Sequence, residues 1–318
     1  MKYVFILNPM SGKRDARTAV EPIVRAWFEG KDYDWELVET EYPQHAREIA
    51  KKAAEAGGPV RICACGGDGT LSEVVSGVFG CENVEVAHYP CGSGNDFVKC
   101  YGDAQAFRSV EAIVEGAAQP IDLLRVNDML CMNLISVGID ADVAEGMNKW
   151  RKYKFLRGPM CYNLAVVDCL LRPLGKHMRL TVGDEVLEGS FMLAAAGNGK
   201  VYGGGYMATP DAVVDDGIID VVTVDKIPLT RIVKVLGIYK KGQHFQNGEV
   251  TEELRDCLRY HKTNRLRIES DKDFALNVDG EILHTRDVSV EMLHHSLQFV
   301  VPPCYAKKTE NRGAAASV

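Results

Sequence analysis

Three short segments in the first third of the chain combine glycines with hydroxyl, amide and charged side chains. They occupy residues 8–13, 66–70 and 90–96, and each follows an apolar run. Glycines let backbone N–H groups approach a phosphate closely, and the N-terminus of a following helix adds positive potential. Ser11, Thr70 and Ser93 can donate hydroxyl hydrogen bonds, and Lys13 can offset phosphate charge. The three segments therefore predict a binding site for phosphate groups.

Asp68 lies inside the second segment, in the order Gly66-Gly67-Asp68-Gly69-Thr70. A carboxylate beside phosphates implies an intervening divalent cation, so this segment predicts Mg²⁺. An ordinary strand-to-helix turn is the alternative, but an aspartate flanked by three glycines has little structural purpose. No segment fits the Walker pattern or the Gly-x-Gly-x-x-Gly fingerprint, which argues against P-loop NTPases and Rossmann dehydrogenases.

Two acidic turns in the second half of the chain are further candidates. Asp279-Gly280-Glu281 follows a predicted strand. Asp-Gly is common in hairpin turns, which is the preferred interpretation from the residues alone, although a carboxylate can also accept the proton of an alcohol. Residues 210–218 carry three aspartates ahead of another strand. They form either an acidic surface turn or an oxygen-only site for Mg²⁺.

Alternating strands and helices must position the three glycine-bearing segments. We expect strands at residues 2–7, 35–40, 60–64 and 84–89, and helices at residues 16–28, 46–56, 71–79 and 106–115. This order predicts an α/β domain, a parallel sheet with helices on both faces. Ligands bind beyond the carboxyl ends of such strands, where the three segments would gather.

Short strands dominate after residue 120. We expect them at residues 122–126, 129–137, 178–182, 186–196, 218–224, 265–269, 274–278 and 288–292, with helices at residues 160–171 and 229–240. This pattern predicts a mostly antiparallel β-sandwich as a second domain. The domain boundaries are expected at residues 1–121 and 122–297. A last strand is expected at residues 297–301, and residues 298–318 can return to the first domain.

Size and charge limit the function classes. A chain of 318 residues exceeds the usual size of one hydrophobic core, so two domains are expected. The net charge of −7 excludes a global basic field for nucleic acid. No apolar run is long enough to span a bilayer, so no transmembrane segment is expected. The ten cysteines include no Cys-x-x-Cys pair and indicate reduced thiols in a cytoplasmic protein.

Together the motifs resemble the diacylglycerol kinase catalytic domain, which sphingosine and ceramide kinases share. The resemblance spans residues 5–301 and rests on the three glycine-bearing segments, on Gly217 after Asp216 and on Asp279-Gly280-Glu281. It implies an ATP site with bound Mg²⁺ in the first domain. The residues it assigns to this site are Asn8, Ser11, Gly12, Lys13, Thr40, Gly66, Gly67, Gly69, Thr70, Gly92, Ser93, Gly94 and Asn95.

The resemblance also assigns catalytic and metal roles. It implies that Asp279 is the general base, that Glu281 orients it, and that Asp68 lies by the Mg²⁺ of the nucleotide. In the loop at residues 210–218, it implies a structural Mg²⁺ held by the side chain of Asp216 and the carbonyls of Val213 and Ile218. The second domain would then be the lipid-substrate domain, with the reaction in a cleft between the domains.

The expected function is transfer of the γ-phosphoryl group of ATP to a lipid hydroxyl, with diacylglycerol as the first candidate and phosphatidic acid as its product. A NAD-kinase-like enzyme with a soluble acceptor and a non-catalytic nucleotide- or lipid-binding module are the alternatives. The lipid implies peripheral association with the inner face of the membrane, and a homodimer is left open. Residues 150–157 interleave aromatics with four cations, which fits either a membrane-facing lip or a solvated charged turn.

Overall fold

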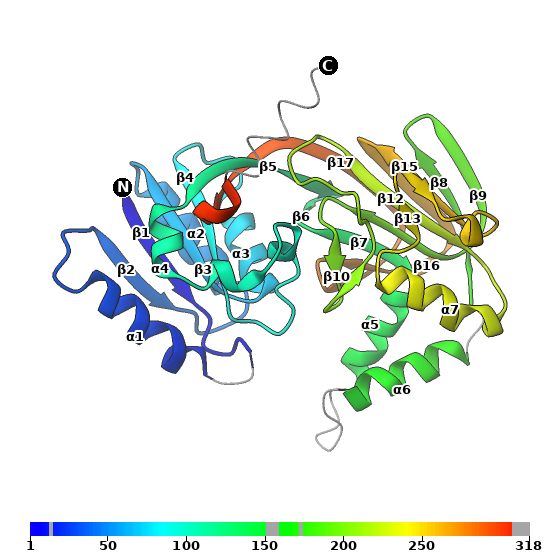
Figure 1. Ribbon diagram of the computed structural model, residues 1–318, viewed down its shortest axis with the longest axis horizontal. Coiled ribbons are helices and arrows are strands. Elements are labelled where there is room, and N and C mark those ends of the chain that lie inside the picture. Colours follow the sequence, from blue (N-terminus) through cyan, green and yellow to red (C-terminus); the bar gives the residue numbers. More distant parts are fainter. Residues whose placement is uncertain (13–14, 151–158, 172–173, 307–318) are drawn as a thin grey trace. The chain divides into compact units, whose positions relative to one another are not determined.

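The computed structural model describes residues 1–12, 15–150, 159–171 and 174–306 (Figure 1). The chain divides into two compact units. The first unit comprises Met1–Asp122 and the chain from His294 onward, and the second comprises Leu123–Leu293. Within the described residues, no helix is both long enough and apolar enough to cross a membrane.

The first unit is built on a parallel sheet in the order β4-β3-β1-β2. Helices alternate with these strands along the chain (Figure 1). The elements are β1 Lys2–Leu7, α1 Ala16–Phe28, β2 Trp35–Glu39, α2 His45–Glu55, β3 Val60–Gly66, α3 Asp68–Val78, β4 Val84–Pro90 and α4 Val110–Glu115, with short 3₁₀ helices at Phe97–Cys100 and Ala104–Phe107.

Apolar spacing explains how α1 packs in the first unit. Its buried residues are Ala16, Val20, Val24 and Phe28, which recur every fourth position and so share one face of the helix. The ring of Phe28 stacks on that of Trp35 at 4.8 Å between centroids. All seven residues of β3 are buried, as expected for a strand inside a covered parallel sheet.

The second unit is rich in strands, as predicted from the sequence. Its strands pair antiparallel with one another. Its elements are the end of β5 Ala117–Val126, β6 Met129–Cys131, β7 Leu134–Gly138, α5 Ile139–Trp150, α6 Pro159–Leu170, β8 Lys176–Val182, β9 Glu185–Gly197, β10 Val201–Tyr202, β11 Tyr206–Met207, β12 Ile219–Asp225, α7 Leu229–Lys240, β13 Phe245–Gln246, β14 Glu249–Val250, a 3₁₀ helix at Glu252–Leu254, β15 Leu258–Thr263, β16 Arg265–Val278 and most of β17 Glu281–Val301.

Two long strands of the second unit, β9 and β16, change their pairing partners along their length. The first part of β9 and of β16 pairs with β8, and the later part of each pairs with β7. Apolar side chains from these four strands, among them Ile135, Leu180, Phe191 and Leu276, share one core. A second core lies between the sheet and helices α5, α6 and α7.

Several elements differ from the sequence prediction, among them β15, which was not predicted, and β16, which joins the strands expected at residues 265–269 and 274–278. The expected strand at residues 129–137 is two strands, β6 and β7, because the chain leaves the ladder at Met132 and Asn133. The expected strands at residues 288–292 and 297–301 belong to one strand, β17. Helix α5 was not predicted, although it lies beside the cavity described below.

Candidate functional site

The three glycine-bearing segments come together at the carboxyl ends of β1, β3 and β4. The backbone N–H of Asn8 donates to the carbonyl of Cys65 at 3.0 Å, and its side-chain Nδ2 donates to Thr70 Oγ1 at 3.0 Å. These bonds join the first segment to the second. The backbone N–H of Gly92 donates to the carbonyl of Gly66 at 3.2 Å, which joins the second segment to the third.

Glycines are required where the segments touch. A Cβ atom on Gly67 would lie 3.2 Å from the Cα of Gly92, and a Cβ on Gly92 would meet Gly67 more closely still. Gly12 has φ +84°, and a Cβ there would lie 2.5 Å from the carbonyl oxygen of Cys91. Side chains at these positions would force the backbones apart, so the glycines set the spacing of the candidate phosphate site.

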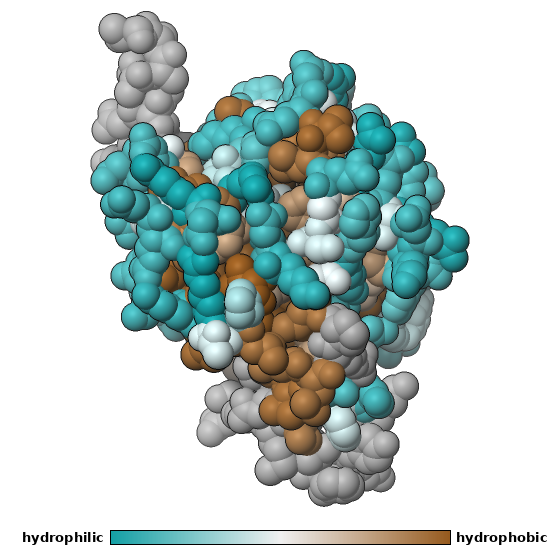
Figure 2. All heavy atoms as spheres, turned by 90° about the vertical axis from the view of Figure 1, so that its right-hand side faces the viewer, coloured by the Kyte–Doolittle hydropathy of each residue, from teal (hydrophilic) through white to brown (hydrophobic). Residues whose placement is uncertain are grey.

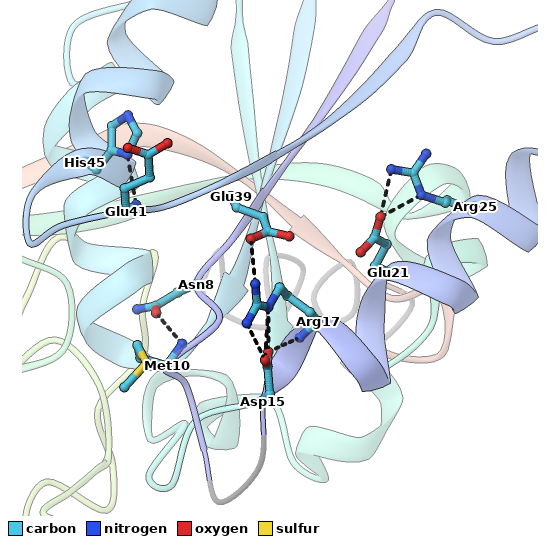
Figure 3. A network of polar contacts seen from close by, with 9 residues as sticks. All are labelled: Asn8, Met10, Asp15, Arg17, Glu21, Arg25, Glu39, Glu41 and His45. Carbon is cyan, nitrogen blue, oxygen red and sulfur yellow. Dashed lines mark hydrogen bonds and ion pairs between the residues drawn. The ribbon is translucent and has the colours of Figure 1, made fainter.

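Polar contacts fix the start of the first segment and the start of the helix α1 that follows it (Figure 3). Asn8 Oδ1 accepts a hydrogen bond from the backbone N–H of Met10 at 3.0 Å. Asp15 caps α1 by accepting from the backbone N–H of Arg17 at 3.0 Å, and the guanidinium of Arg17 also pairs with Glu39 at 3.6 Å. Lys13 lies outside the described residues.

Asp68 is the first residue of α3 and is half-buried. Its Oδ1 accepts the backbone N–H of Asp96 at 2.7 Å and that of Phe97 at 3.3 Å. A Cβ on Gly94 would lie 2.9 Å from Asp68 Oδ2. One carboxylate oxygen therefore anchors the third segment, while the other faces the Gly94 backbone.

The remaining predicted nucleotide residues surround these contacts. The backbone N–H of Gly92 donates to Asn95 Oδ1 at 3.0 Å, and Asn95 Nδ2 donates back to the carbonyl of Gly92 at 2.8 Å. Gly69 and Ser93 are exposed. The backbone N–H of Thr40, at the end of β2, donates to the carbonyl of Leu7 at 2.9 Å. The backbone N–H of Ser11 donates to the carbonyl of Asn8 at 3.1 Å.

In the second unit, backbone N–H groups hold the carboxylate of Asp279. It accepts hydrogen bonds from the backbone N–H groups of Met132 at 2.6 Å, Asn133 at 3.1 Å and Leu134 at 2.9 Å. The thiol of Cys131 donates to Oδ1 at 3.2 Å. Oδ2 accepts the bond from Met132 and a longer branch from Asn133 at 3.4 Å, so Oδ2 is the less occupied of the two oxygens.

Burial and hydrogen bonding act in opposite directions on the pKa of Asp279. Burial raises the pKa above its usual range, and the N–H donors of Leu134, Met132 and Asn133 and the thiol of Cys131 oppose that rise. The net pKa shift is upward. Burial and the neighbouring Asp279 together raise the pKa of the Cys131 thiol, which stays protonated as a donor. A carboxylate with a raised pKa is a stronger base than an exposed one.

The turn that carries Asp279 is a two-residue hairpin. Asp279 has φ +47° and Gly280 has φ +98°, and Val278 pairs with Glu281 across the turn. Positive φ at both positions is typical of a type I′ turn. Glu281 is exposed at the start of β17. Its predicted role in orienting Asp279 remains a prediction, while the described donors to Asp279 come from residues 131–134.

The aspartate loop ahead of β12 carries the predicted metal ligands. Asp216 is exposed and precedes Gly217, which has φ +74°. Asp216 Oδ1 accepts the backbone N–H of Ile218 at 3.0 Å. The predicted donors, this carboxylate and the carbonyls of Val213 and Ile218, are all oxygens. Such a donor set fits Mg²⁺, which prefers oxygen ligands and retains water.

Sequence reasoning missed a cavity of about 200 Å³ in the second unit, which lies among α5, α6, α7 and neighbouring strands. Val143, Val166 and Leu236 line it, together with the polar side chains of Asp140 and Tyr202. Burial raises the pKa of Asp140 to about 6, although the neighbouring Ser136 and Tyr202 hydroxyls oppose this shift. Because α5 was not predicted, no sequence signal placed Asp140 at a cavity.

The predicted membrane lip lies mainly outside the described residues. Trp150 ends α5, while residues 151–157 are not described. A membrane-facing role for residues 150–157 therefore stays a prediction.

Comparisons with known proteins agree with the two-unit division. A family model described as "Diacylglycerol kinase catalytic domain" matches residues 2–126, and one described as "YegS C-terminal NAD kinase beta sandwich-like domain" matches residues 133–301. A diacylglycerol kinase of Bacillus subtilis (strain 168) is 26% identical over 281 residues, which cover 87% of this chain and 88% of that protein.

Two further proteins are similar over most of their length. The "Probable lipid kinase YegS-like" of Shewanella frigidimarina is 29% identical over 263 residues, which cover 80% of this chain and 81% of that protein. A crystal structure of a Bacillus anthracis protein superposes with a TM-score of 0.74 at 24% identity, covering 96% of this chain and 98% of that one, and so shares the fold. The chain belongs to the diacylglycerol kinase catalytic-domain family and, with that family, is a kinase.

Proposed function

We propose that the protein is an ATP-dependent lipid kinase that transfers the γ-phosphoryl group to a lipid hydroxyl, with diacylglycerol as the first candidate acceptor. The observation that carries the proposal is the close contact of Gly67 with Gly92 between two glycine-bearing segments. This contact, with the bonds from Asn8, holds the three segments together at one end of the sheet, beside the N-terminus of α3. Such a site suits the phosphates of a nucleotide.

In this proposal, the first unit binds ATP. Gly12, Gly67 and Gly92 let the backbone approach the phosphates, and the exposed hydroxyl of Ser93 donates to a phosphate oxygen. The N-terminus of α3 adds positive potential. Mg²⁺ bound with the nucleotide would neutralise the charge on the transferred group. Asp68 would help to hold that cation, and its Oδ1 anchors the third segment through the N–H groups of Asp96 and Phe97.

Asp279 is the proposed general base. The lipid hydroxyl gives its proton to Asp279 Oδ2 as its oxygen forms a bond to the γ-phosphorus, and the bond from that phosphorus to the β,γ-bridging oxygen breaks. ADP leaves with the bridging oxygen, and the lipid carries the phosphate. The N–H groups of residues 132–134 fix the orientation of the carboxylate. The structural Mg²⁺ proposed at Asp216, Val213 and Ile218 would stabilise the loop before β12.

Two apolar features of the second unit support a lipid acceptor. The cavity among α5, α6 and α7 is largely lined by apolar side chains, which suits an acyl chain. Exposed apolar side chains also occur on α6 and α7 and just beyond α6: Val167, Leu171, Leu229 and Val233 are 54%, 82%, 57% and 76% exposed. The four exposed side chains, here called the apolar patch, suit contact with a membrane surface. Figure 2 shows that hydrophobic side chains also gather at the lower end of one face.

The decisive experiment supplies γ-labelled ATP, Mg²⁺ and a total lipid extract, and identifies the labelled product. Labelled phosphatidic acid supports the proposal in full, and another labelled phospholipid supports it with a different acceptor. Labelled NADP with added NAD and no lipid product favours the NAD-kinase-like alternative. ATP binding without a labelled product from any acceptor would contradict the proposal.

A further inference from the structure

Two adjacent histidines and a buried aspartate lie together in the first unit, and none of them belongs to a glycine-bearing segment. Asp122 of β5 is fully buried, and His294 and His295 belong to β17. Their possible ligand atoms all lie within 4.8 Å of one another. The imidazole Nδ1 of His294 is 2.8 Å from Asp122 Oδ1, and the backbone N–H of His295 donates to the same oxygen at 2.7 Å.

The backbone of β17 departs from a regular strand to bring both imidazoles to one side. Successive side chains of a strand normally point to opposite faces. His295 has φ +50°, an uncommon conformation for a residue other than glycine or asparagine. The two rings consequently stack, with centroids 3.7 Å apart and planes inclined at 26°. The chain thus places two nitrogen ligands beside one carboxylate.

The ligand types select the class of cation. Mg²⁺ prefers oxygen donors, whereas two imidazoles and one carboxylate suit Zn²⁺ and similar transition-metal ions. The side chain of Asp122 is fully buried, while that of His294 is 51% exposed and gives an ion access. The two imidazoles and the carboxylate offer three ligands, and a water molecule can complete the four-coordinate geometry that zinc prefers.

We propose that Asp122, His294 and His295 form a binding site for Zn²⁺ or a similar divalent transition-metal ion, separate from the Mg²⁺ of the phosphoryl transfer. The ion would link β5 to β17, two strands that pair with each other. The site lies at the two points of the chain where the first unit ends, at Asp122 and at His294. We expect the ion to have a structural role, because its three ligands include neither a residue of the proposed ATP site nor the proposed general base, Asp279.

The test uses the full chain, freed of metal with a chelator and titrated with Zn²⁺ by calorimetry. We expect one Zn²⁺ per chain, and at least tenfold weaker binding in His294→Ala, His295→Ala and Asp122→Asn. His177→Ala is the matched control, because His177 is an exposed histidine of the second unit, and it should bind Zn²⁺ as the original chain does. Equal affinity and stoichiometry in the original chain and in the His294→Ala/His295→Ala double variant would overturn the proposal.

Cobalt spectroscopy tests the ligand set without any substitution. Co²⁺ bound to nitrogen and oxygen gives ligand-field bands alone, which is the expected result. An intense thiolate charge-transfer band would show that cysteines hold the ion and would overturn the assignment. The melting temperature gives a second measure of binding, because an ion that binds only the folded chain raises the melting temperature of that chain. That rise should occur in the original chain and in His177→Ala, and be lost in His294→Ala.

Discussion

The carboxylate of Asp279 accepts a hydrogen bond of 2.6 Å from the backbone N–H of Met132, a residue far away in the sequence. With the N–H groups of Asn133 and Leu134, this bond fixes the carboxylate before any substrate arrives. A carboxylate held in this way loses little freedom when it accepts a proton, which suits the general base proposed for the reaction.

Replacing Asp279 with asparagine should abolish most of the lipid kinase activity. A general base contributes about 10²–10⁴-fold in rate, so kcat should fall by that factor while the affinity for ATP is kept. The amide also places an N–H group against the N–H donors of residues 132–134, which should lower the free energy of unfolding by about 1–3 kcal/mol. Activity must therefore be measured per folded molecule, below the melting temperature of the variant.

Asp271→Asn is the matched control for this variant, because Asp271 is an exposed aspartate on the same strand, β16. It removes the same charge and should leave both kcat and stability close to the original values. Near-normal turnover by Asp279→Asn would show that another group accepts the proton.

Asp140 predicts a pH dependence of stability. Burial raises its folded pKa to about 6, whereas an unfolded aspartate titrates at about 3.9. The folded state therefore holds the proton more tightly, and stability from this group is lost as the pH rises from about 4 to about 6. At pH 8 the ionised side chain costs the fold roughly 3 kcal/mol, since each tenfold difference in proton affinity corresponds to about 1.36 kcal/mol.

Asp140→Asn should consequently raise the free energy of unfolding at pH 8 by roughly 2–3 kcal/mol and have little effect below about pH 4. Denaturant titrations at several pH values measure this difference. Asp271→Asn, which changes an exposed group, should show no such pH-dependent gain. A gain of equal size at every pH would mean that ionisation of Asp140 is not its cause.

The spacing of the glycine-bearing segments can be tested at Gly92. A Cβ at this position would collide with the backbone of Gly67, so Gly92→Ala must push the two segments apart. Overpacking of this kind typically costs about 1–3 kcal/mol, enough to weaken ATP binding by roughly tenfold or more. Calorimetry with a non-hydrolysable ATP analogue measures the loss.

Gly237→Ala is the control for this substitution. Gly237 lies inside α7, and nothing lies within 4 Å of a Cβ there. This variant should bind the analogue normally and gain about 0.5–1 kcal/mol of stability, because alanine favours a helix more than glycine does. Normal nucleotide binding by Gly92→Ala would place the phosphates away from these segments.

The sequence predicted that the three glycine-bearing segments gather at one end of the sheet, because the determinants of that arrangement are local. Each segment follows its own strand, and the parallel pairing of β1, β3 and β4 brings the strand ends together. The contact of Gly67 with Gly92 was not predictable, since it depends on the exact path of two loops. The glycines indicated that the backbone comes close to another group, but they did not indicate which segment that group belongs to.

The surroundings of Asp279 and Asp140 could not be predicted because they depend on distant packing. The donors to Asp279 come from residues 131–134, where the sequence suggested a continuous strand. Helix α5 contains Gly146, which has low helix propensity. A Cβ there would lie 3.1 Å from the Cβ of Ala165 in α6, so close helix packing, not local preference, explains this glycine. Because α5 was not predicted, the cavity that it lines was not predicted either.

The apolar patch should determine how the enzyme reaches lipid in a membrane. Burying a side chain such as Leu171 or Val233 in the bilayer interface contributes up to about 1.5–3 kcal/mol, and a charge there opposes insertion. Leu171→Asp and Val233→Asp should therefore bind vesicles of diacylglycerol and phospholipid at least about tenfold more weakly. Co-sedimentation with vesicles measures binding, and labelled phosphate transfer measures activity on the same vesicles.

The same variants should phosphorylate detergent-solubilised diacylglycerol at close to the original rate, because the proposed role of the patch is in docking and not in phosphoryl transfer. Gln243→Asp is the matched control: it adds one negative charge at an exposed position outside the patch and should bind vesicles normally. Equal vesicle binding by all three variants would show that these side chains do not contact the membrane. Equal loss of activity on vesicles and in detergent would instead indicate damage to the cavity among α5, α6 and α7, which Val166 and Leu236 help to line.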